Sequence, residues 1–260
     1  MKIATWNVNS IKARLEAVTE WLKEAEPDIA CLQELKCTDD TFPREAFEDL
    51  GYNCAVHGQK TYNGVAILSK LPLEDVTPRL PGGDGDDHAR YLEAVVSGKK
   101  GTLRVASIYA PNGNPIGTDK YTYKLGWLER LAAHARDVLA LEEPAALMGD
   151  YNVIPTPDDV YDPKAWLNDA LFQPESRAGL RRIEYLGYTD AFRACHAETH
   201  QYTFWDYQAG AWQKDHGIRI DHILLSPQAA DHLTHSAIDK QVRGRERPSD
   251  HVPVWCELDL

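Results

Sequence analysis

The sequence lacks several features that would place it in common classes of protein. Its five cysteines, at positions 31, 37, 54, 195 and 256, are scattered and form no Cys-x-x-Cys pair, which argues against a disulfide framework or a thiolate zinc site. No apolar run reaches the roughly 18 residues of a membrane-spanning helix, and the start shows no apolar stretch typical of a signal peptide. We therefore expect a cytoplasmic protein with reduced thiols and no membrane contact.

Positive charge is also scarce. The 28 Lys and Arg residues against 40 Asp and Glu residues give a net charge of −12, which argues against binding of nucleic acid or anionic membrane by bulk charge. Any phosphate-bearing partner must then be held locally or through a metal. The motifs Gly-x-x-x-x-Gly-Lys and Gly-x-Ser-x-Gly are absent, so neither a nucleotide triphosphatase nor a serine hydrolase is supported.

The apolar pattern predicts a mixed α/β protein. Apolar and β-branched residues without helical spacing predict strands at 3–7, 28–34, 64–69, 90–96, 103–109, 145–148, 220–225 and 252–258. Helical spacing predicts a helix from an N-cap at Ser10 to Pro27 and another over 119–141, whereas 155–180 is expected to be irregular. Because no linker or repeat divides the sequence, we expect one domain over 1–260 with two sheet-containing halves, about 1–115 and 116–260.

Polar side chains recur where the predicted strands begin or end. They are Asn7, Glu34, Tyr109, Asp150, Asn152, Asp221, Asp250 and His251. Any one of them alone is explained by loop capping, but unpaired buried carboxylates are costly, and a shared cation is their simplest partner. Oxygen donors without thiolates favour Mg²⁺ or Mn²⁺ over zinc. A divalent ion beside a His-Asp couple is what phosphodiester hydrolysis requires, because the metal offsets phosphoryl charge while a base activates water.

Six short motifs occur in an order known from one enzyme family. They are Trp6-Asn-Val-Asn9, Leu32-Gln-Glu34, Tyr109-Ala-Pro-Asn112, Gly149-Asp-Tyr-Asn152, Arg219-Ile-Asp-His222 and Pro248-Ser-Asp-His251. In this order the chain resembles the exonuclease III family, and bacterial abasic-site endonucleases of that type in particular. The resemblance implies a DNase I-like, four-layer α/β sandwich, with two mixed sheets packed face to face, helices outside and the site at one edge.

The resemblance also implies roles for the polar residues. The implied metal site consists of Glu34 as principal ligand, Asn7 as the amide that orients it, and Asp150, Asn152 and Asp250. The implied catalytic residues are Tyr109, Asp150, Asn152, Asp221 and His251. Asp221 would hold His251 in one tautomer, and whether His251 or Asp150 activates the water stays open. The implied cofactor is Mg²⁺, with Mn²⁺ able to substitute.

The same motifs imply contacts to substrate. Asn112 matches an amide that contacts phosphate, and Phe204, Trp205 and Ile218 match an apolar pocket that accepts a baseless sugar. Basic clusters are expected to grip the DNA backbone through Lys214, Arg219, Arg243 and Arg245, the last two in a loop over 240–247. Some family members have Trp at the position of Ile218 and many have Gly at that of Ser10, so the balance of endonuclease to exonuclease activity stays open.

These features predict a metal-dependent DNA-repair phosphodiesterase. It would cleave double-stranded DNA 5′ to abasic sites, leave a 3′-hydroxyl, and also act as a 3′→5′ exonuclease and 3′-phosphatase. The alternatives are a phosphodiesterase for lipid head groups, inositol phosphates or RNA tails, and a DNA-binding module with a relict site. The aromatic residues around Phe204 favour DNA over lipid, and the intact set of acids with His251 speaks against lost catalysis. We expect a monomer associated with the nucleoid.

Overall fold

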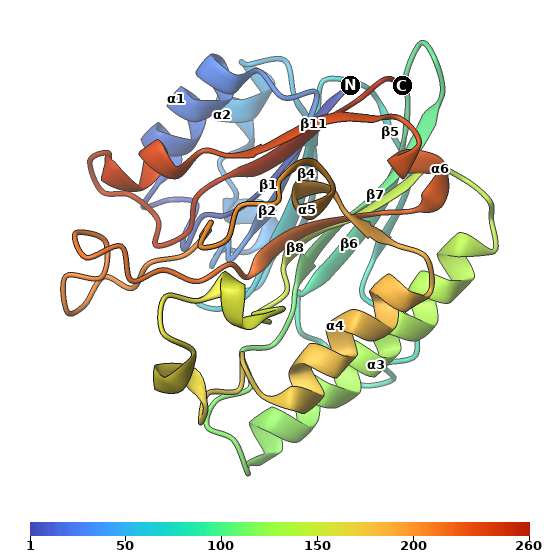
Figure 1. The fold of residues 1–260 in the computed structure, drawn as a ribbon. Coiled ribbons are helices and arrows are strands. Elements are labelled where there is room, and N and C mark those ends of the chain that lie inside the picture. Colours follow the sequence, from blue (N-terminus) through green and yellow to red (C-terminus); the bar gives the residue numbers. More distant parts are fainter.

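Two six-stranded β-sheets lie face to face in the computed structural model, which describes residues 1–260 (Figure 1). The first sheet has the order β11 (Leu233–Ile238), β12 (Val254–Leu258), β1 (Lys2–Asn7), β2 (Ile29–Gln33), β4 (Val65–Ser69) and β3 (Asn53–His57). The second has the order β5 (Leu73–Pro78), β6 (Tyr91–Ser97), β7 (Thr102–Tyr109), β8 (Ala145–Asp150), β10 (Asp221–Leu225) and β9 (Thr189–Asp190). Strands β1 and β2 are parallel, as are β7 and β8, and the other pairs are antiparallel, so both sheets are mixed.

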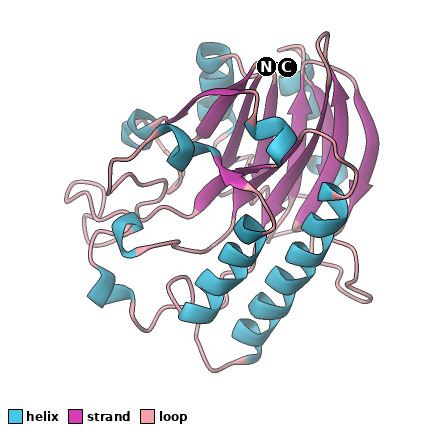
Figure 2. Cartoon of the chain, turned by 45° about the vertical axis from the view of Figure 1, so that its right-hand side comes forward, coloured by secondary structure: helices cyan, strands magenta, loops and turns pink.

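Helices cover the outer faces of both sheets (Figure 2). Helices α1 (Leu15–Ala25) and α2 (Arg44–Glu48) pack on the first sheet, and α3 (Asp119–Leu139) and α4 (Pro174–Tyr185) pack outside the second. Short elements complete the chain: α5 (Ala191–Cys195), α6 (Pro227–Ala230), and the 3₁₀ turns Asp39–Thr41, Pro157–Asp159, Pro163–Trp166 and Lys240–Gly244. None of the helices combines the length and the apolar character needed to span a bilayer. The arrangement is the four-layer sandwich that the resemblance implied.

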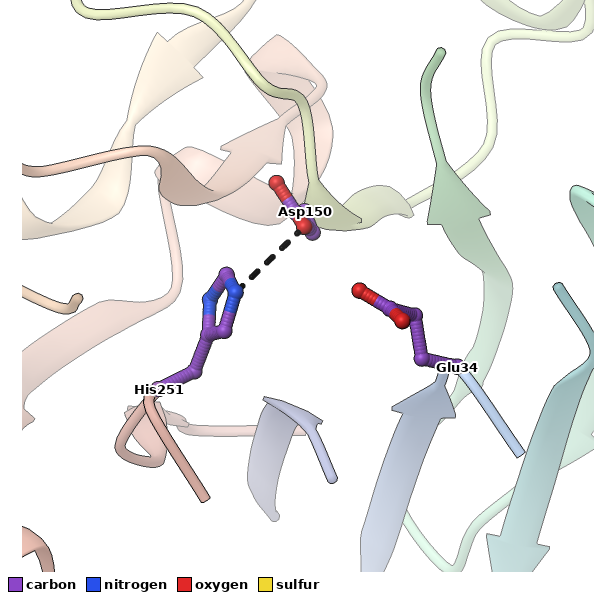
Figure 3. A group of neighbouring side chains, drawn as sticks. All are labelled: Glu34, Asp150 and His251. Atoms are coloured by element: carbon purple, nitrogen blue, oxygen red, sulfur yellow. Dashed lines mark ion pairs between the residues drawn. The ribbon is translucent and has the colours of Figure 1, made fainter. Parts of the chain in front are cut away.

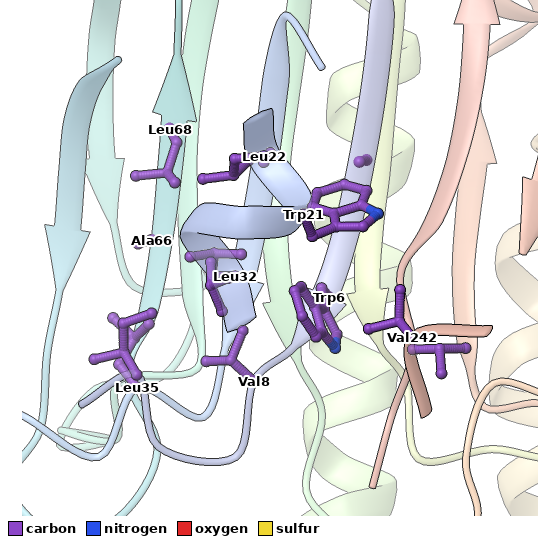
Figure 4. Close-up of a cluster of buried hydrophobic side chains, with 14 of the residues drawn as sticks. Trp6, Val8, Trp21, Leu22, Leu32, Leu35, Ala66, Leu68 and Val242 are labelled. Atoms are coloured by element: carbon purple, nitrogen blue, oxygen red, sulfur yellow. The ribbon is translucent and has the colours of Figure 1, made fainter. Parts of the chain in front are cut away.

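The central strands are buried on both faces, which explains their nearly continuous apolar sequences. Because successive side chains of a strand point to opposite faces, Ile3 and Cys31 pack between the sheets while Trp6 and Leu32 pack under α1 (Figure 4). The Trp6 ring meets the edge of Trp21 from α1, with ring centroids 5.7 Å apart. This packing fixes the ends of β1 and β2, where the polar residues follow.

The strands that sequence patterning did not predict are the sheet edges. The four edge strands are β11, β3, β5 and β9, and β5 is exposed along most of its length. An edge strand buries little, so it carries no clear apolar pattern. The predicted boundary near residue 115 lies between β7 and α3, and each sheet combines strands from both sides of it. A relationship between two similar halves stays a prediction.

Two helix boundaries differ from the prediction. The segment predicted to be irregular over 155–180 contains the start of α4 at Pro174, because this helix buries the small residues Ser176 and Gly179 against its neighbours. The first helix begins at Leu15 rather than after Ser10, because Ser10 has φ +85° and belongs to the loop that leaves β1. In both cases the sequence did not reveal where the helix begins, because the conformation of the residues at that point depends on tertiary packing.

Candidate active site

The predicted polar residues converge at one end of the two sheets. Asn7 ends β1 and Glu34 follows β2, and since these strands are parallel, their carboxyl ends lie together. Tyr109 ends β7 and is paired with Asp150 at the end of the parallel strand β8. Asp221 begins the antiparallel strand β10 at the same level, directly opposite Asp150. The strand topology therefore places these side chains at a single edge of the sandwich.

Glu34, Asp150 and His251 form the one group of side chains suited to hold a metal ion (Figure 3). Their nearest donor atoms all lie within 4.8 Å of one another. The Asn7 amide joins the two acids by donating to Glu34 Oε1 and to Asp150 Oδ2, each at 2.9 Å. Carboxylate oxygens and an imidazole without thiolate suit Mg²⁺ or Mn²⁺, so the residues present fit the implied cofactor.

Lys36 and Asn9 extend this group toward Asp250. The Lys36 ammonium lies 3.0 Å from Glu34 Oε2 and donates to Asn9 Oδ1. Asn9 in turn donates to Asp250 Oδ1 at 3.1 Å, so Asp250 lies beside the Glu34 group rather than within it. Burial alone would raise the pKa of Glu34, but the charge of Lys36 and the Asn7 hydrogen bond lower it. Sequence reasoning missed Lys36, because a lysine two residues after a strand usually faces solvent.

His251 is held between two carboxylates. Its Nδ1 lies 2.8 Å from Asp221 Oδ2, and its Nε2 lies 3.7 Å from Asp150 Oδ2. Burial lowers the pKa of His251, yet the charges of Asp221 and Asp150 raise it well above its ordinary value. Burial raises the pKa of Asp150 against the opposing charge of His251. The Phe204 ring packs edge-on against the imidazole at 5.0 Å, which restricts its rotation.

Tyr109 presents a neutral phenol next to Glu34. Burial and the charges of Glu34 and Asp150 raise the pKa of Tyr109 well above its ordinary value, so the hydroxyl keeps its proton. The guanidinium of Arg90 lies 5.0 Å from the centre of the Tyr109 ring and donates to the Tyr109 carbonyl at 3.3 Å. Arg90 belongs to none of the six motifs, and its place at the start of a predicted strand, just before β6, did not mark it as a site residue. The phenol is therefore placed to donate a hydrogen bond.

Asn152 is fixed by hydrogen bonds on both sides of its loop. Its backbone N–H donates to Asp150 Oδ1 and its side-chain amide donates to the Ala110 carbonyl, both at 2.9 Å. The exposed Asn112 amide lies 3.4 Å from Asn152 Oδ1. The ammonium of Lys124, buried in α3, donates to the backbone carbonyls of both asparagines. Burial lowers the pKa of Lys124 to about 7, although Asp150 and Asp169 oppose the shift.

The residues predicted to contact substrate fall into two groups. Phe204 is partly exposed beside His251, and Lys214 is exposed in the loop after it. Trp205, Ile218 and Arg219 are buried, at 0%, 1% and 2% exposure. Trp205 and Ile218 therefore lie beneath the surface rather than facing an open pocket.

All four predicted DNA-binding cations have protein partners, including the exposed Lys214, whose ammonium donates to the Ala209 carbonyl at 2.9 Å. Arg219 donates to Asp159 and to Asp190, each at 2.7 Å. Arg243 is buried and donates to the Trp205 carbonyl at 3.1 Å. Arg245 pairs with Glu24 of α1. This placement differs from the free surface cations that the basic clusters led us to expect, because sequence clustering of charge carries no information on burial.

A cavity of about 500 Å³ opens beside Glu34 and Tyr109. Its lining includes Lys36, Arg90 and Asn112, which offer hydrogen-bond donors and positive charge. Although the chain has a net negative charge, cationic side chains thus lie next to the group formed by Glu34, Asp150 and His251. Such a surface suits an anionic polymer with one of its phosphates at that group.

Comparison with known proteins agrees with this geometry. Residues 4–251 match the sequence profile of the Endonuclease/Exonuclease/phosphatase family. The chain belongs to this family. Within it, the chain is 32% identical to exodeoxyribonuclease III of Haemophilus influenzae, covering 99% of this chain and 100% of the relative. It is 30% identical to the DNA repair nuclease APEX1 of Danio rerio, covering 99% of this chain and 82% of that protein.

Solved structures in the family share the whole architecture. An AP endonuclease from Archaeoglobus fulgidus is 39% identical with a TM-score of 0.94, and both chains are covered completely. The 3′-5′ exonuclease NExo from Neisseria meningitidis is 41% identical with a TM-score of 0.95, again with complete coverage. The predicted DNase I-like fold, the resemblance to exonuclease III and the prediction of a nuclease hydrolase are thereby confirmed.

Proposed function

We propose that this protein is a metal-dependent DNA-repair phosphodiesterase that cleaves duplex DNA on the 5′ side of abasic sites and leaves a 3′-hydroxyl. We also propose that it trims 3′ ends as a 3′→5′ exonuclease and 3′-phosphatase. The observation that carries this proposal is the meeting of Glu34, Asp150 and the His251–Asp221 couple at one sheet edge. The relatives support it, since they include an AP endonuclease and a 3′ phosphatase described as bound to a product DNA hairpin.

The proposed cofactor is Mg²⁺, with Mn²⁺ able to substitute. Glu34 and Asp150 would hold it, Asn7 would orient both carboxylates, and Asn152 and Asp250 would lie at its border. When bound, the ion supplies positive charge that offsets the negative charge of the phosphoryl oxygens. The choice of Mg²⁺ is supported by the potential metal ligands, which are mainly oxygen atoms and include no thiolate.

The protein's own residues would then position the phosphate and move protons. Water attacks the phosphorus, the bond to the 3′ oxygen of the upstream nucleotide breaks, and that oxygen takes up a proton. Asp150 and His251 lie 3.7 Å apart and are the two candidates to accept the proton of the water, with Asp221 fixing the imidazole. Tyr109 donates to the leaving oxygen, and the Asn152 amide donates to an oxygen of the transition state.

We assign the proposed substrate contacts to those predicted residues whose side chains are at least partly exposed. Phe204 would pack against the baseless sugar, while Asn112 and Lys214 would contact phosphates of the double-stranded DNA. Trp205 and Ile218 would support Phe204 from below, and Arg219, Arg243 and Arg245 would brace the loops. We further propose a monomer that acts in the cytoplasm at the nucleoid, in keeping with five cysteines that form no disulfide.

The test is a duplex carrying one tetrahydrofuran abasic analogue, incubated with the protein and either Mg²⁺ or EDTA. A single nick 5′ to the analogue, present only with Mg²⁺, is expected, and its absence would contradict the proposal. Parallel reactions with a 3′-phosphate duplex, sphingomyelin and an adenine-tailed RNA separate the alternatives. Preferred hydrolysis of the lipid or the RNA would replace the proposed substrate, and DNA binding without any cleavage would favour a relict site.

A further inference from the structure

Lys124 is a fully buried lysine without an ion-pair partner. Its side chain has 0% exposure, and no carboxylate oxygen lies within 4.0 Å of its ammonium. A buried ammonium destabilises the fold unless hydrogen bonds satisfy it. A lysine on the buried face of α3 therefore needs a physical explanation. Its neighbours on α3, Trp127 and Leu128, are the apolar residues expected at such positions. Packing alone would be served better by an apolar side chain.

The Lys124 ammonium bridges the two loops that carry the site's asparagines. It donates to the Asn112 carbonyl at 3.0 Å and to the Asn152 carbonyl. Asn112 lies in the loop after β7 and Asn152 in the loop after β8. Nearer the strand ends, Ala110 N–H donates to the Asp150 carbonyl at 2.8 Å and the Asn152 amide donates to the Ala110 carbonyl at 2.9 Å. The Lys124 ammonium adds a further link at the Asn112 carbonyl, two residues beyond Ala110, and so ties this part of the first loop to the second.

The loop is shaped to let this lysine reach both carbonyls. Gly113, which follows Asn112, has φ +86°, and a Cβ there would lie 2.5 Å from Lys124 Cδ. Glycine at this position thus provides both the backbone conformation and the space for the lysine stem. With the two carbonyls held in this way, the side-chain amides of the same residues also lie close together, since the Asn112 amide is 3.4 Å from Asn152 Oδ1.

We propose that Lys124 is a positioning residue that holds the amides of Asn112 and Asn152 at the spacing needed to contact one phosphate. This inference rests on the proposed function, in which both asparagines face the phosphodiester. Lys124 does not touch the substrate and acts through the two carbonyls. Because a misplacement of about 1 Å can cost on the order of 100-fold in rate, its loss should reduce turnover more than binding.

The test compares Lys124→Met with Lys124→Arg and with Lys99→Met, which removes an exposed lysine beyond the far ends of β6 and β7. Lys124→Met should lower kcat for the abasic duplex by at least 30-fold and change KM and the Kd for DNA less than threefold. Lys124→Arg, which keeps the charge and the donors, should recover at least a third of wild-type kcat. Lys99→Met should match the wild type.

A second readout does not depend on activity. In NMR spectra of the metal-free protein, Lys124→Met should shift the side-chain amide resonances of Asn112 and Asn152. The resonances of Asn53 should not shift, because Asn53 lies in the first sheet, where it donates to the Ser69 carbonyl. Unmoved Asn112 and Asn152 resonances would overturn the proposal, as would equal losses in kcat and DNA affinity, or a loss of kcat that only tracks the unfolded fraction. If wild-type protein fails to nick the duplex, the proposed function fails, while shifted resonances would still support the positioning role.

Discussion

Asp150 and Asp221 stand directly opposite each other on β8 and β10, and the imidazole of His251 lies between their carboxylates. Like charges at directly opposed positions of an antiparallel pair destabilise a sheet. Here the charge of His251 offsets the repulsion between the two carboxylates. The pair of acids, which would destabilise another sheet, therefore orients the imidazole ring. Since Nδ1 faces Asp221, Nε2 is directed at Asp150 and the metal-binding group.

Replacing Asp221 by Asn tests this orientation. The variant removes the carboxylate that fixes the imidazole but keeps its shape, so kcat for abasic-site cleavage should fall on the order of 10³- to 10⁴-fold, as in hydrolases with a comparable His-Asp couple. KM should change little, because Asp221 is buried and does not reach the substrate. Steady-state kinetics on the abasic duplex checks both values.

Asp239→Asn is the matched control for Asp221→Asn. Asp239 also accepts side-chain N–H donors, from Trp21 and Trp255, but it lies outside the site. Normal kcat in Asp239→Asn beside reduced kcat in Asp221→Asn is expected. Wild-type turnover in Asp221→Asn would remove this residue from the catalytic set.

Metal binding should be visible as added stability. At a Mg²⁺ concentration of 100 times Kd, binding to the folded state alone adds about 2.7 kcal/mol, equivalent to a rise of roughly 5–10 °C in Tm for a chain of this size. Glu34→Gln keeps the hydrogen-bonding shape but removes the charge, so its Tm should not respond to Mg²⁺. Differential scanning calorimetry with Mg²⁺ or EDTA measures the difference.

An exposed acid provides the control for the metal experiment. Glu198→Gln changes the net charge by the same amount on a surface loop, and its Tm should respond to Mg²⁺ as the wild type does. An equal Mg²⁺ response in Glu34→Gln would show that the ion binds elsewhere.

The sequence predicted the centre of this fold better than its borders. Strands β1 and β2 are buried on both faces, so their composition alone revealed them, and the acids after them stood out because burial penalises charge. The edge strand β5 buries little and left no pattern. Lys124 in α3 and Arg90 just before β6 were missed for the opposite reason, since a lone basic residue in or beside an element normally faces solvent. Only tertiary contacts show that Lys124 is buried and that Arg90 is half-buried against the Tyr109 ring.

Ser10 illustrates a strained position that can be relieved. Its φ of +85° is unfavourable for a residue with a Cβ, and its side chain receives only a long hydrogen bond of 3.4 Å from Ala13 N. Ser10→Gly should therefore stabilise the protein by about 1 kcal/mol. Urea unfolding should show a higher midpoint with an unchanged m-value.

The control for Ser10→Gly is Ala17→Gly in the middle of α1. A glycine there should destabilise by roughly 1 kcal/mol, because it adds backbone entropy to the unfolded chain and loses helix propensity. A lower midpoint for Ser10→Gly as well would show that the conformation of Ser10 is not strained.

Glu93, which is not a member of the active-site group, should make stability depend on pH. Burial alone would raise its pKa, but hydrogen bonds with His134, Tyr91 and Arg104 lower it to about 2. A carboxyl with a folded-state pKa below its unfolded value of about 4.5 stabilises the protein above that value. The stabilisation is then lost as pH falls from about 5 toward 2, and its full size is roughly 3 kcal/mol.

The measurement is the free energy of unfolding of wild type and Glu93→Gln between pH 7 and pH 2.5. At pH 7 the wild type should be more stable, because glutamine leaves Arg104 without its 2.8 Å charged partner. The gap should narrow as the pH falls below 5, since protonation of Glu93 makes the wild type resemble the variant. Glu74→Gln, which removes an exposed carboxyl without an ion-pair partner, should keep a constant gap. A gap between wild type and Glu93→Gln that stays constant with pH would mean that Glu93 has no lowered pKa and that its hydrogen bonds contribute equally when it is neutral.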